Sequence, residues 1–568
     1  MHAISTRTRR RRLGALAGAA LSALLVTGCV AGDTDDADGG STAGGTAVLA
    51  MLQEPGSMNP VFSNEGAAVL STGPVLEPLF TPLADGTYEP LLAAELPSVE
   101  NGGISEDGLT ITFVLREGIT WSDGEPLTSE DLVFTWEVIN DPESATASRP
   151  AYTKVAGITA VDEQTVEVTM TAVNPLYLDL FQSILPAHRF ESTTIPINDP
   201  LARLPLGTGP FVYGEWRTGD TLELVRNDAY WRDPELPALA GITWKIVADR
   251  ETAITSLARG EYDGLWWLLA GDVEVLQAEI DGGAPVELLQ SDQQGLPEWI
   301  WYNHTDPANP TQPHPVLGDL AVREAIDAAI DRESIIETVL KGNAELTGGL
   351  INVGQYRCDV PVTEFDPAAA NAALDAAGWV PGADGVREKD GVRASLRFTT
   401  VSGSQQRVLY QQIIQENLAD VGIEVEIANV ESTVLFAPFA DGGMMATGDF
   451  DLLLTLDGLR TPDPSEFVSR FTTASIPSAE NPGGFSYTRW SNADYDAAVA
   501  AAGATLDTAV AGAEYATACE IFHDERVALP LYAGVDTYAH SLTLADVGID
   551  AWGGMWQNPG IAEWRIAD

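Results

Sequence analysis

Acidic residues gather beside two tryptophans between residues 118 and 141, in the run GITWSDGEPLTSEDLVFTWEVIND. Two carboxylates that converge across an aromatic-lined cleft can cleave a glycosidic bond, one of them acting as the acid. The local pattern predicts another role, because Asp123-Gly124 is a turn signal and Thr128 is a helix N-cap with Asp131 at the capping-box position. Carboxylates are favoured in a first helical turn by the helix dipole. We therefore expect this segment to be scaffold, and no catalytic residue is assigned.

Other chemistry that a chain of this size could carry leaves no trace in the sequence. The motifs HExxH, GxSxG and the Walker lysine motif are absent from it. The six histidines stand at positions 2, 188, 304, 314, 523 and 540, and no two share the i, i+3 or i, i+4 spacing of a helical metal site. We predict no resident metal and no cofactor. A ligand that carries a chelated metal and contacts His304 and His314 stays possible. A surface-anchored glycosidase is another alternative, and it would be tested by incubating the protein with glycans and looking for new reducing ends.

Composition limits the class of protein. A chain of 568 residues is too long for one core, so two or three domains are expected. Hydrophobic residues make up 45% and tryptophans number 14, which excludes a mainly disordered chain. The formal net charge of −53 makes nucleic acid an unsuitable partner, because binding it requires clustered cations.

The N-terminus has the order of an export signal. Five arginines within residues 7–12 precede an apolar run that is too short to span a bilayer, and small residues follow it. The residues Val26-Thr27-Gly28-Cys29 resemble a bacterial lipobox, in which the cysteine is lipidated and becomes the mature N-terminus. We predict a signal peptide over 1–28, a lipid on Cys29, and a Gly-, Ser- and Asp-rich tether over 29–46. Export by the general or the twin-arginine route stays open.

The elements that would position a site alternate between strands and helices. Period-two alternation predicts strands, and apolar residues at helical spacing predict helices. A strand, a helix and a second strand in succession over 393–430 predict a βαβ unit and a partly parallel sheet. The expected helices cover about 250–259, one continuous stripe over 322–340, 366–378, 405–421 and 511–525, and a strand is expected at 528–536.

Seven segments, in this order, resemble the family 5 extracellular solute-binding proteins of ABC importers. They are EPGSMNP, DGLTITFVLREGITWSDGEPLTSEDLVFTWE, GTGPFVYGEW, GEYD, VREAIDAAIDRESII, FDPAAANAALDAAGW and DPSEF, and they extend over nearly all of the predicted mature chain. That family includes proteins that bind oligopeptides, dipeptides, nickel chelates and some oligosaccharides. The resemblance also implies that the 118–141 segment lies in a scaffold domain away from the ligand.

The resemblance implies an α/β, two-lobed periplasmic-binding-protein type II fold (cluster C) with an additional α+β domain on the first lobe. The expected parts are lobe I over 47–88, 195–302 and 527–568, the extra domain over 89–194, and lobe II over 303–526. The chain would cross between lobes near 298–304 and 526–532. Such a protein would be a monomer on the extracytoplasmic face of the membrane that closes on a peptide-like solute and delivers it to a permease with ATPase subunits. A binder of an oligosaccharide or another solute, such as a metal chelate, is the alternative.

The ligand site departs from the family pattern. In peptide-binding relatives, a buried Asp three residues before an Asp-Pro pair holds the peptide's α-ammonium. Here the pair is Asp463-Pro464, and the corresponding residue is Arg460. A cation cannot hold an ammonium, and Asp457, three residues earlier, is the residue that could take that role. Otherwise Arg460 binds an anionic group of the ligand, or it pairs with Asp457 and the pocket takes a neutral polar ligand; an Arg460 that points to solvent is a further alternative. The candidate ligand-binding residues are Arg460, Asp457, Glu54, Asn303, Trp266, Trp267, Phe436 and Trp552.

Two further expectations concern side-chain pairs. Of the adjacent Trp266 and Trp267, one should face the core and the other the cleft, because neighbouring strand residues point to opposite faces. Cys358 and Cys519 remain once Cys29 is lipidated, and in an oxidising compartment they could form a disulfide. Two buried thiols are the alternative.

Overall fold

Two mixed β-sheets organise this protein, which is described here from a computed structural model. The structure describes residues 44–63, 65–83, 85–144, 146–147, 150–196, 198–291, 296–548 and 559–567. All of these residues belong to one unit that runs from Ala43 to Asp568. The predicted signal peptide, Cys29 and most of the tether lie outside the described residues. No described helix combines the length and the apolar character needed to cross a membrane.

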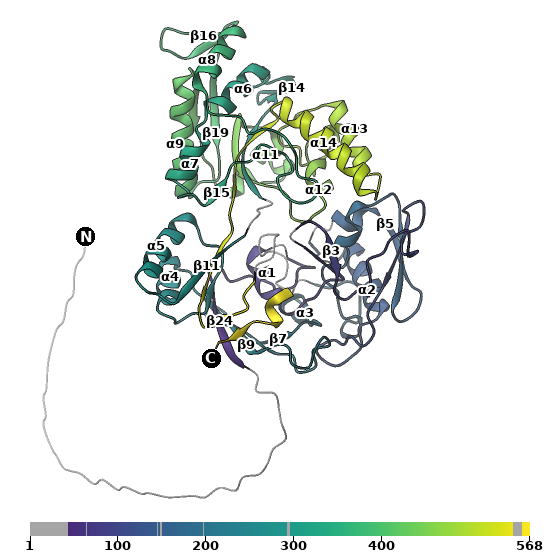
Figure 1. Cartoon of the computed structure of the whole chain (residues 1–568). Helices are drawn as coiled ribbons and strands as arrows, with labels where there is room; N and C mark the ends of the chain where they lie inside the picture. The colour runs from purple at the N-terminus through teal and green to yellow at the C-terminus, as the bar shows by residue number, and fades with distance from the viewer. Residues whose placement is uncertain are drawn as a thin grey trace, which may run out of the picture. The chain divides into compact units, whose positions relative to one another are not determined.

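The first sheet has seven strands in the order β11-β23-β10-β1-β9-β8-β7. β1 runs parallel to both β9 and β10, and the remaining pairs are antiparallel. Helices α4 (Arg250–Ala258) and α5 (Ala270–Asp281) pack beside it (Figure 1). We call this sheet with its helices the first lobe. Its strands are β1 (Gly44–Met51), β7 (Phe211–Arg217), β8 (Thr221–Arg226), β9 (Leu239–Ile246), β10 (Gly264–Leu265), β11 (Val286–Gln290) and β23 (Thr537–Ser541).

The second sheet has six strands in the order β15-β22-β12-β21-β19-β20. The predicted βαβ unit is confirmed, since β19 and β20 are parallel and α9 (Gln405–Asp420) connects them (Figure 1). We call this sheet and its helices the second lobe. Its strands are β12 (Pro297–Tyr302), β15 (Ala344–Glu345), β19 (Ser395–Thr399), β20 (Glu424–Ile427), β21 (Leu452–Leu456) and β22 (Ala528–Gly534).

The chain passes between the two sheets at points that differ from the expected ones. It leaves the first sheet after β11 and enters the second at Pro297, and it returns between Gly534 and Thr537. The expected boundaries at 302 and 527 are therefore wrong, because β12 and β22 both pair within the second sheet. Both strands are apolar and buried, so their composition does not indicate which sheet they join.

A smaller domain forms between α1 (Gly66–Thr72) and β7. Its antiparallel sheet has the order β4-β6-β5, with β4 (Thr110–Val114), β5 (Val155–Ala160) and β6 (Thr165–Met170), and α2 (Ser129–Asn140) contacts β5 and β6. The same core includes the hairpin of β2 (Phe80–Pro82) and β3 (Tyr88–Pro90), so this extra domain begins before residue 89.

The 118–141 segment forms the capped helix that its local pattern predicts. The Asp131 carboxylate accepts hydrogen bonds from the backbone N–H of Thr128 at 2.9 Å and of Ala187 at 2.8 Å. Asp123 pairs instead with His188 and Arg189 on the surface. These acids therefore fix the start of α2 and the neighbouring loop.

The second-lobe helices predicted at 366–378, 405–421 and 511–525 are confirmed, one predicted span needs a correction, and the helices between residues 432 and 502 were not predicted. The stripe expected over 322–340 is two helices, because the Asp331 carboxylate accepts from Ser334 N and begins a new helix. Cys358 and Cys519 form a disulfide, with 5.8 Å between their Cα atoms, that ties the segment before α8 to α14. The helices are α6 (Leu320–Ala329), α7 (Arg332–Thr338), α8 (Pro367–Ala376), α10 (Ser432–Leu435), α11 (Met444–Thr447), α12 (Ser465–Ser469), α13 (Ala493–Ala502) and α14 (Thr508–Asp524).

Candidate functional site

The strand directions show which strand ends of each sheet lie next to the chain crossings. We call this row of strand ends the crossing-side edge; the term does not refer to the outermost strands. In the first sheet, β1 and β10 end at this edge, β11 ends there, and β23 begins there. In the second sheet, β12 begins at this edge while β19, β20, β21 and β22 end there. Ligands of open α/β sheets bind beyond the carboxyl ends of the strands. The loops at these two crossing-side edges are therefore the candidate site.

On the first lobe, the loop after β1 carries Glu54. Its carboxylate accepts hydrogen bonds from Trp216 Nε1 at 2.8 Å and from Gly219 N at 3.0 Å. Both partners belong to the β7–β8 hairpin. Glu54 therefore ties the site loop to the sheet, and its carboxylate is occupied within the first lobe.

The two tryptophans after β10 both contact the first-lobe core but differ in burial. Trp266 is 7% exposed and stacks on Trp564, with ring centroids 5.7 Å apart, inside the first-lobe core. Trp267 is half-buried and has a φ of 59°. Left-handed backbone is unusual for a bulky residue, and here the carbonyl of Trp267 accepts from Arg250 Nη1 at 2.9 Å, which holds that geometry. Of the two, only Trp267 has ring surface left for a ligand.

On the second lobe, Asp457 follows the end of β21 and pairs with Arg470. Arg470 Nη1 lies 2.8 Å from both Asp457 carboxylate oxygens, and its Nη2 lies 2.6 Å from Glu466 Oε1. Burial raises the pKa of Asp457, and the neighbouring Arg470 opposes that shift. The direct partner of this carboxylate is Arg470, which α12 places against it, while Arg460 acts on Asp457 through its charge.

Arg460 lies three residues beyond Asp457 and is exposed. Among the described residues its guanidinium makes no salt bridge and no hydrogen bond, but its charge lowers the pKa of the nearby Asp457. Asp457, in contrast, also accepts from Gly458 N at 2.9 Å and is only 7% exposed. The crossing-side edge therefore presents a cation at Arg460 and a neutralised carboxylate at Asp457.

A second ion pair at this edge was not predicted from the sequence. Arg407, in the first turn of α9, has its Nε 2.9 Å from Glu298 Oε1 at the start of β12. Burial raises the pKa of Glu298, and Arg407 opposes the shift. One sequence signal could have indicated this pair. Arg407 lies in the first turn of a predicted helix, where the helix dipole disfavours a positive charge, so an acidic partner was to be expected. The charges of Arg407 and Glu298 therefore balance each other.

Three candidate residues lie away from this edge. Asn303 follows the opposite end of β12, is fully buried, and donates to the carbonyls of Gly448 and Phe450 while its Oδ1 accepts from Thr305. His304 and His314 are at the same far end, and burial lowers the pKa of His304 to about 3. Residues near 303 were expected at a crossing, and the true crossing before Pro297 places them remote from the site. The described residues also contain no cluster of three metal-binding side chains.

The remaining aromatic candidates have different outcomes. Phe436 is 56% exposed at the end of α10, in the segment that follows β20 at the crossing-side edge. Trp552 lies outside the described residues.

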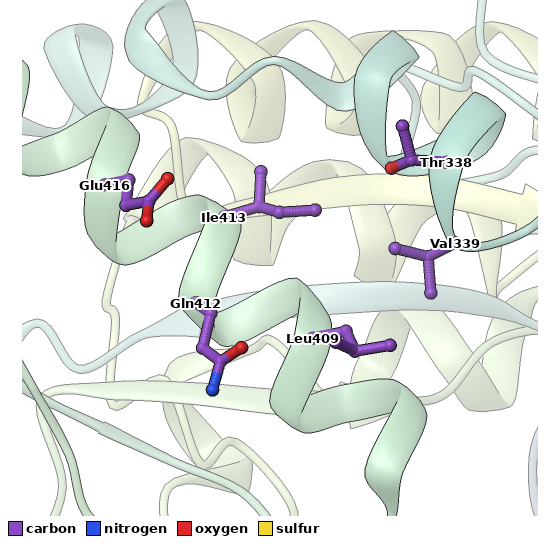
Figure 2. Close-up of a pocket in the computed structure, with 6 residues that line it drawn as sticks. All are labelled: Thr338, Val339, Leu409, Gln412, Ile413 and Glu416. Carbon is purple, nitrogen blue, oxygen red and sulfur yellow. The ribbon is translucent and has the colours of Figure 1, made fainter.

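A pocket of about 310 Å³ lies elsewhere, between α9 and the end of α7 (Figure 2). Figure 2 shows Ile413 and Val339 directed toward the space between the two helices. It lies along the helices rather than at a strand end, so it is separate from the candidate site. Its lining residues are Thr338, Val339, Leu409, Gln412, Ile413 and Glu416.

Comparison with known proteins gives consistent matches. Residues 87–478 match the sequence model of the bacterial extracellular solute-binding proteins, family 5. "Protein XP55" of Streptomyces lividans is 29% identical over 82% of this chain and 83% of its own length. The nickel-binding periplasmic protein of Escherichia coli is 26% identical over 71% of this chain and 76% of its own. The structure of the oligopeptide-binding protein AppA from Bacillus subtilis with a nonapeptide superposes with a TM-score of 0.69, at 22% identity, over 93% of this chain and all of that one.

Proposed function

Because this chain belongs to the family 5 bacterial extracellular solute-binding proteins, a substrate-binding role in an ABC importer follows, and we propose that its solute is peptide-like. The observation that supports the proposal is the pair of crossing-side edges, between which the chain passes twice within the described residues. Two lobes connected in this way close on a ligand by small changes at the crossings. We further propose that a lipid on Cys29 holds the protein at the extracytoplasmic face, where it delivers the solute to a permease.

The charges at the site indicate which group of the solute is recognised. A free peptide N-terminus needs an available carboxylate, and Asp457, Glu298 and Glu54 are all occupied within the protein. Arg460 is exposed and makes no salt bridge among the described residues, although its charge acts on Asp457. We propose that Arg460 binds a carboxylate of the solute, since the planar guanidinium matches that group with two parallel hydrogen bonds.

Two aromatic residues complete the proposed site. Trp267 from the first lobe and Phe436 from the second each have exposed ring surface at the crossing-side edges. They would cover the apolar part of a solute whose carboxylate is held by Arg460. A metal chelate that carries carboxylates is the second candidate, because Arg460 suits it equally and a nickel-binding protein is among the relatives.

Native mass spectrometry of the purified protein would identify the solute that copurifies with it. Its affinity should then be measured for the wild type, for Arg460→Ala and for Arg393→Ala, whose arginine lies just before β19, away from the crossing-side edge. We expect Arg460→Ala to lose about 2 kcal/mol, roughly 30-fold in Kd, as for a hydrogen bond between charged groups. Arg393→Ala should bind as the wild type does. Equal affinity of all three proteins would contradict the role of Arg460.

A further inference from the structure

The extra domain contacts the second lobe at the turn between α13 and α14, away from the two chain crossings. Lys154 ends the short helix η1 (Pro150–Lys154), and its Nζ donates to the carbonyl oxygen of Gly503 at 3.4 Å. Gly503 is the C-cap of α13, whose last turn has no basic residue of its own. In the same turn, Leu506 Cδ1 lies 3.7 Å from a Cβ atom placed on Gly108 of the extra domain. The cation of Lys154 is therefore situated where the dipole of α13 favours a positive charge.

A second contact joins the β2–β3 hairpin of the extra domain to the loop before α8. A Cβ atom placed on Gly86 would lie 3.1 Å from the backbone nitrogen of Gln355, so the two backbone segments approach each other closely. The disulfide bond holds this second-lobe loop on α14, and Tyr356 packs on Tyr515 of α14 with ring centroids 5.0 Å apart. Both contact segments of the second lobe are thus attached to α14 and form one surface.

The extra domain is fastened to the first lobe by a buried carboxyl group. Glu77 lies on the segment that enters the extra domain. Its oxygens accept from Thr208 Oγ1 at 2.9 Å, from the Tyr230 hydroxyl at 2.7 Å and from Trp231 Nε1 at 2.8 Å. Tyr230 and Trp231 follow β8 of the first sheet, and Trp231 also packs against the core of the extra domain. The extra domain therefore moves with the first lobe as one body.

We propose that the extra domain is a latch for closure, which docks on residues 354–356 and 503–506 of the second lobe when the lobes close and leaves them when the lobes open. Rotation about the two crossings moves the first lobe and the extra domain together relative to the second lobe. The contacts of Lys154 and Gly86 lie away from the crossings, so this rotation breaks both. The latch rests on the proposed closure of the lobes and requires no contact with the solute.

The latch affects every solute that the closed form encloses. Where only the closed form holds the solute, the apparent Kd is the Kd of that form divided by the closed fraction of the empty protein. A contact that raises the closed fraction therefore lowers the Kd by the same factor for all solutes. Changes in the latch should alter affinity uniformly, whereas the effect of Arg460→Ala depends on the carboxylate of the solute.

Single-molecule energy transfer in the protein without solute tests the latch, so the result does not depend on which solute is bound. The dyes are attached at Ala278→Cys on α5 of the first lobe and at Ala376→Cys on α8 of the second, both at exposed positions. Cys29→Ala removes the cysteine outside the disulfide, so only the two introduced thiols react. We expect a closed population in this labelled protein. Its complete absence without solute overturns the proposal.

A glycine pair separates the contact from backbone strain. Gly86→Ala places a Cβ atom against the Gln355 backbone and should lower the ratio of closed to open molecules about fivefold or more, as expected for overpacking. Gly118→Ala is the matched control, since φ is 86° at Gly86 and 80° at Gly118, and a Cβ atom at Gly118 meets no described atom within 4 Å. Both substitutions have the strain of left-handed backbone, and only Gly86 faces the second lobe. Equal ratios in the two variants overturn the latch.

A lysine series tests the charge and does not require Gly86→Ala to fold. Lys154→Met removes the cation from the end of α13 and should lower the ratio of closed to open molecules about two- to fivefold, as for a charge at a helix terminus. Lys154→Arg keeps the cation and should remain near the wild-type ratio. If Lys154→Met keeps the wild-type ratio, or Lys154→Arg falls as far as Lys154→Met, the proposal is overturned.

Discussion

Replacing Arg470 with methionine should destabilise the protein, because it leaves the Asp457 carboxylate buried without its cation. The Arg470 side chain is 18% exposed and that of Asp457 is 10% exposed, so solvent compensates little for the lost pair. Removing one partner of a buried ion pair costs about 3–5 kcal/mol. Methionine keeps apolar contact with Phe467 and Phe485, whose rings lie about 6 Å from the guanidinium. We therefore expect a loss at the lower end, about 3 kcal/mol.

Urea unfolding, followed by tryptophan fluorescence, measures this loss against two controls. Arg393→Met removes an exposed ion pair and should cost at most about 1 kcal/mol. The double variant Asp457→Asn with Arg470→Met removes both charges and should recover most of the loss. If Arg470→Met is no less stable than Arg393→Met, or the double variant recovers nothing, the assignment of Arg470 as the partner of Asp457 is refuted.

The pH dependence gives the same reasoning a second test. Burial raises the pKa of Asp457, and Arg470 is the largest influence that lowers it. In Arg470→Met the folded pKa of this carboxyl therefore lies further above its unfolded value of about 3.9. Relative to the wild type, Arg470→Met therefore loses no stability below the unfolded pKa of Asp457. The loss grows as the pH rises and becomes constant above the folded pKa of Asp457 in the variant. The deficit relative to the wild type should be smaller at pH 5 than at pH 8, and a deficit that grows toward pH 5 would contradict this account.

Two further outcomes concern the cysteines. Cys29→Ala should abolish labelling by a fatty-acid analogue and release the protein into the medium, and persistent labelling would rule out lipidation at this residue. Denatured protein that has not been reduced should show no free thiol from Cys358 or Cys519, and the double variant Cys358→Ser with Cys519→Ser should lower the free energy of unfolding by about 2–5 kcal/mol, because the disulfide restricts the unfolded chain. Two titratable thiols, or unchanged unfolding of the double variant, would contradict a stabilising bridge.

The spans and roles of many local elements could be predicted from the sequence. The capping-box pattern at Thr128 and Asp131 predicted the start of α2, and the alternation around β19 and β20 predicted a parallel pair. These features depend on interactions between residues close in the chain, so the local pattern contains the information. The break at Asp331 was also local, and the apolar stripe that continues past it concealed the N-cap.

Sheet membership and charge pairing were decided only by the tertiary structure. A buried apolar strand such as β12 can pair in either sheet, and its assignment to the second sheet moved Asn303 away from the site. Arg460 and Arg470 are both within reach of Asp457 along the chain, and the direction of α12 selects Arg470. The sequence by itself determined which residue types were available, and long-range packing determined which of them meet, because burial and the distance between charges are properties of the folded chain.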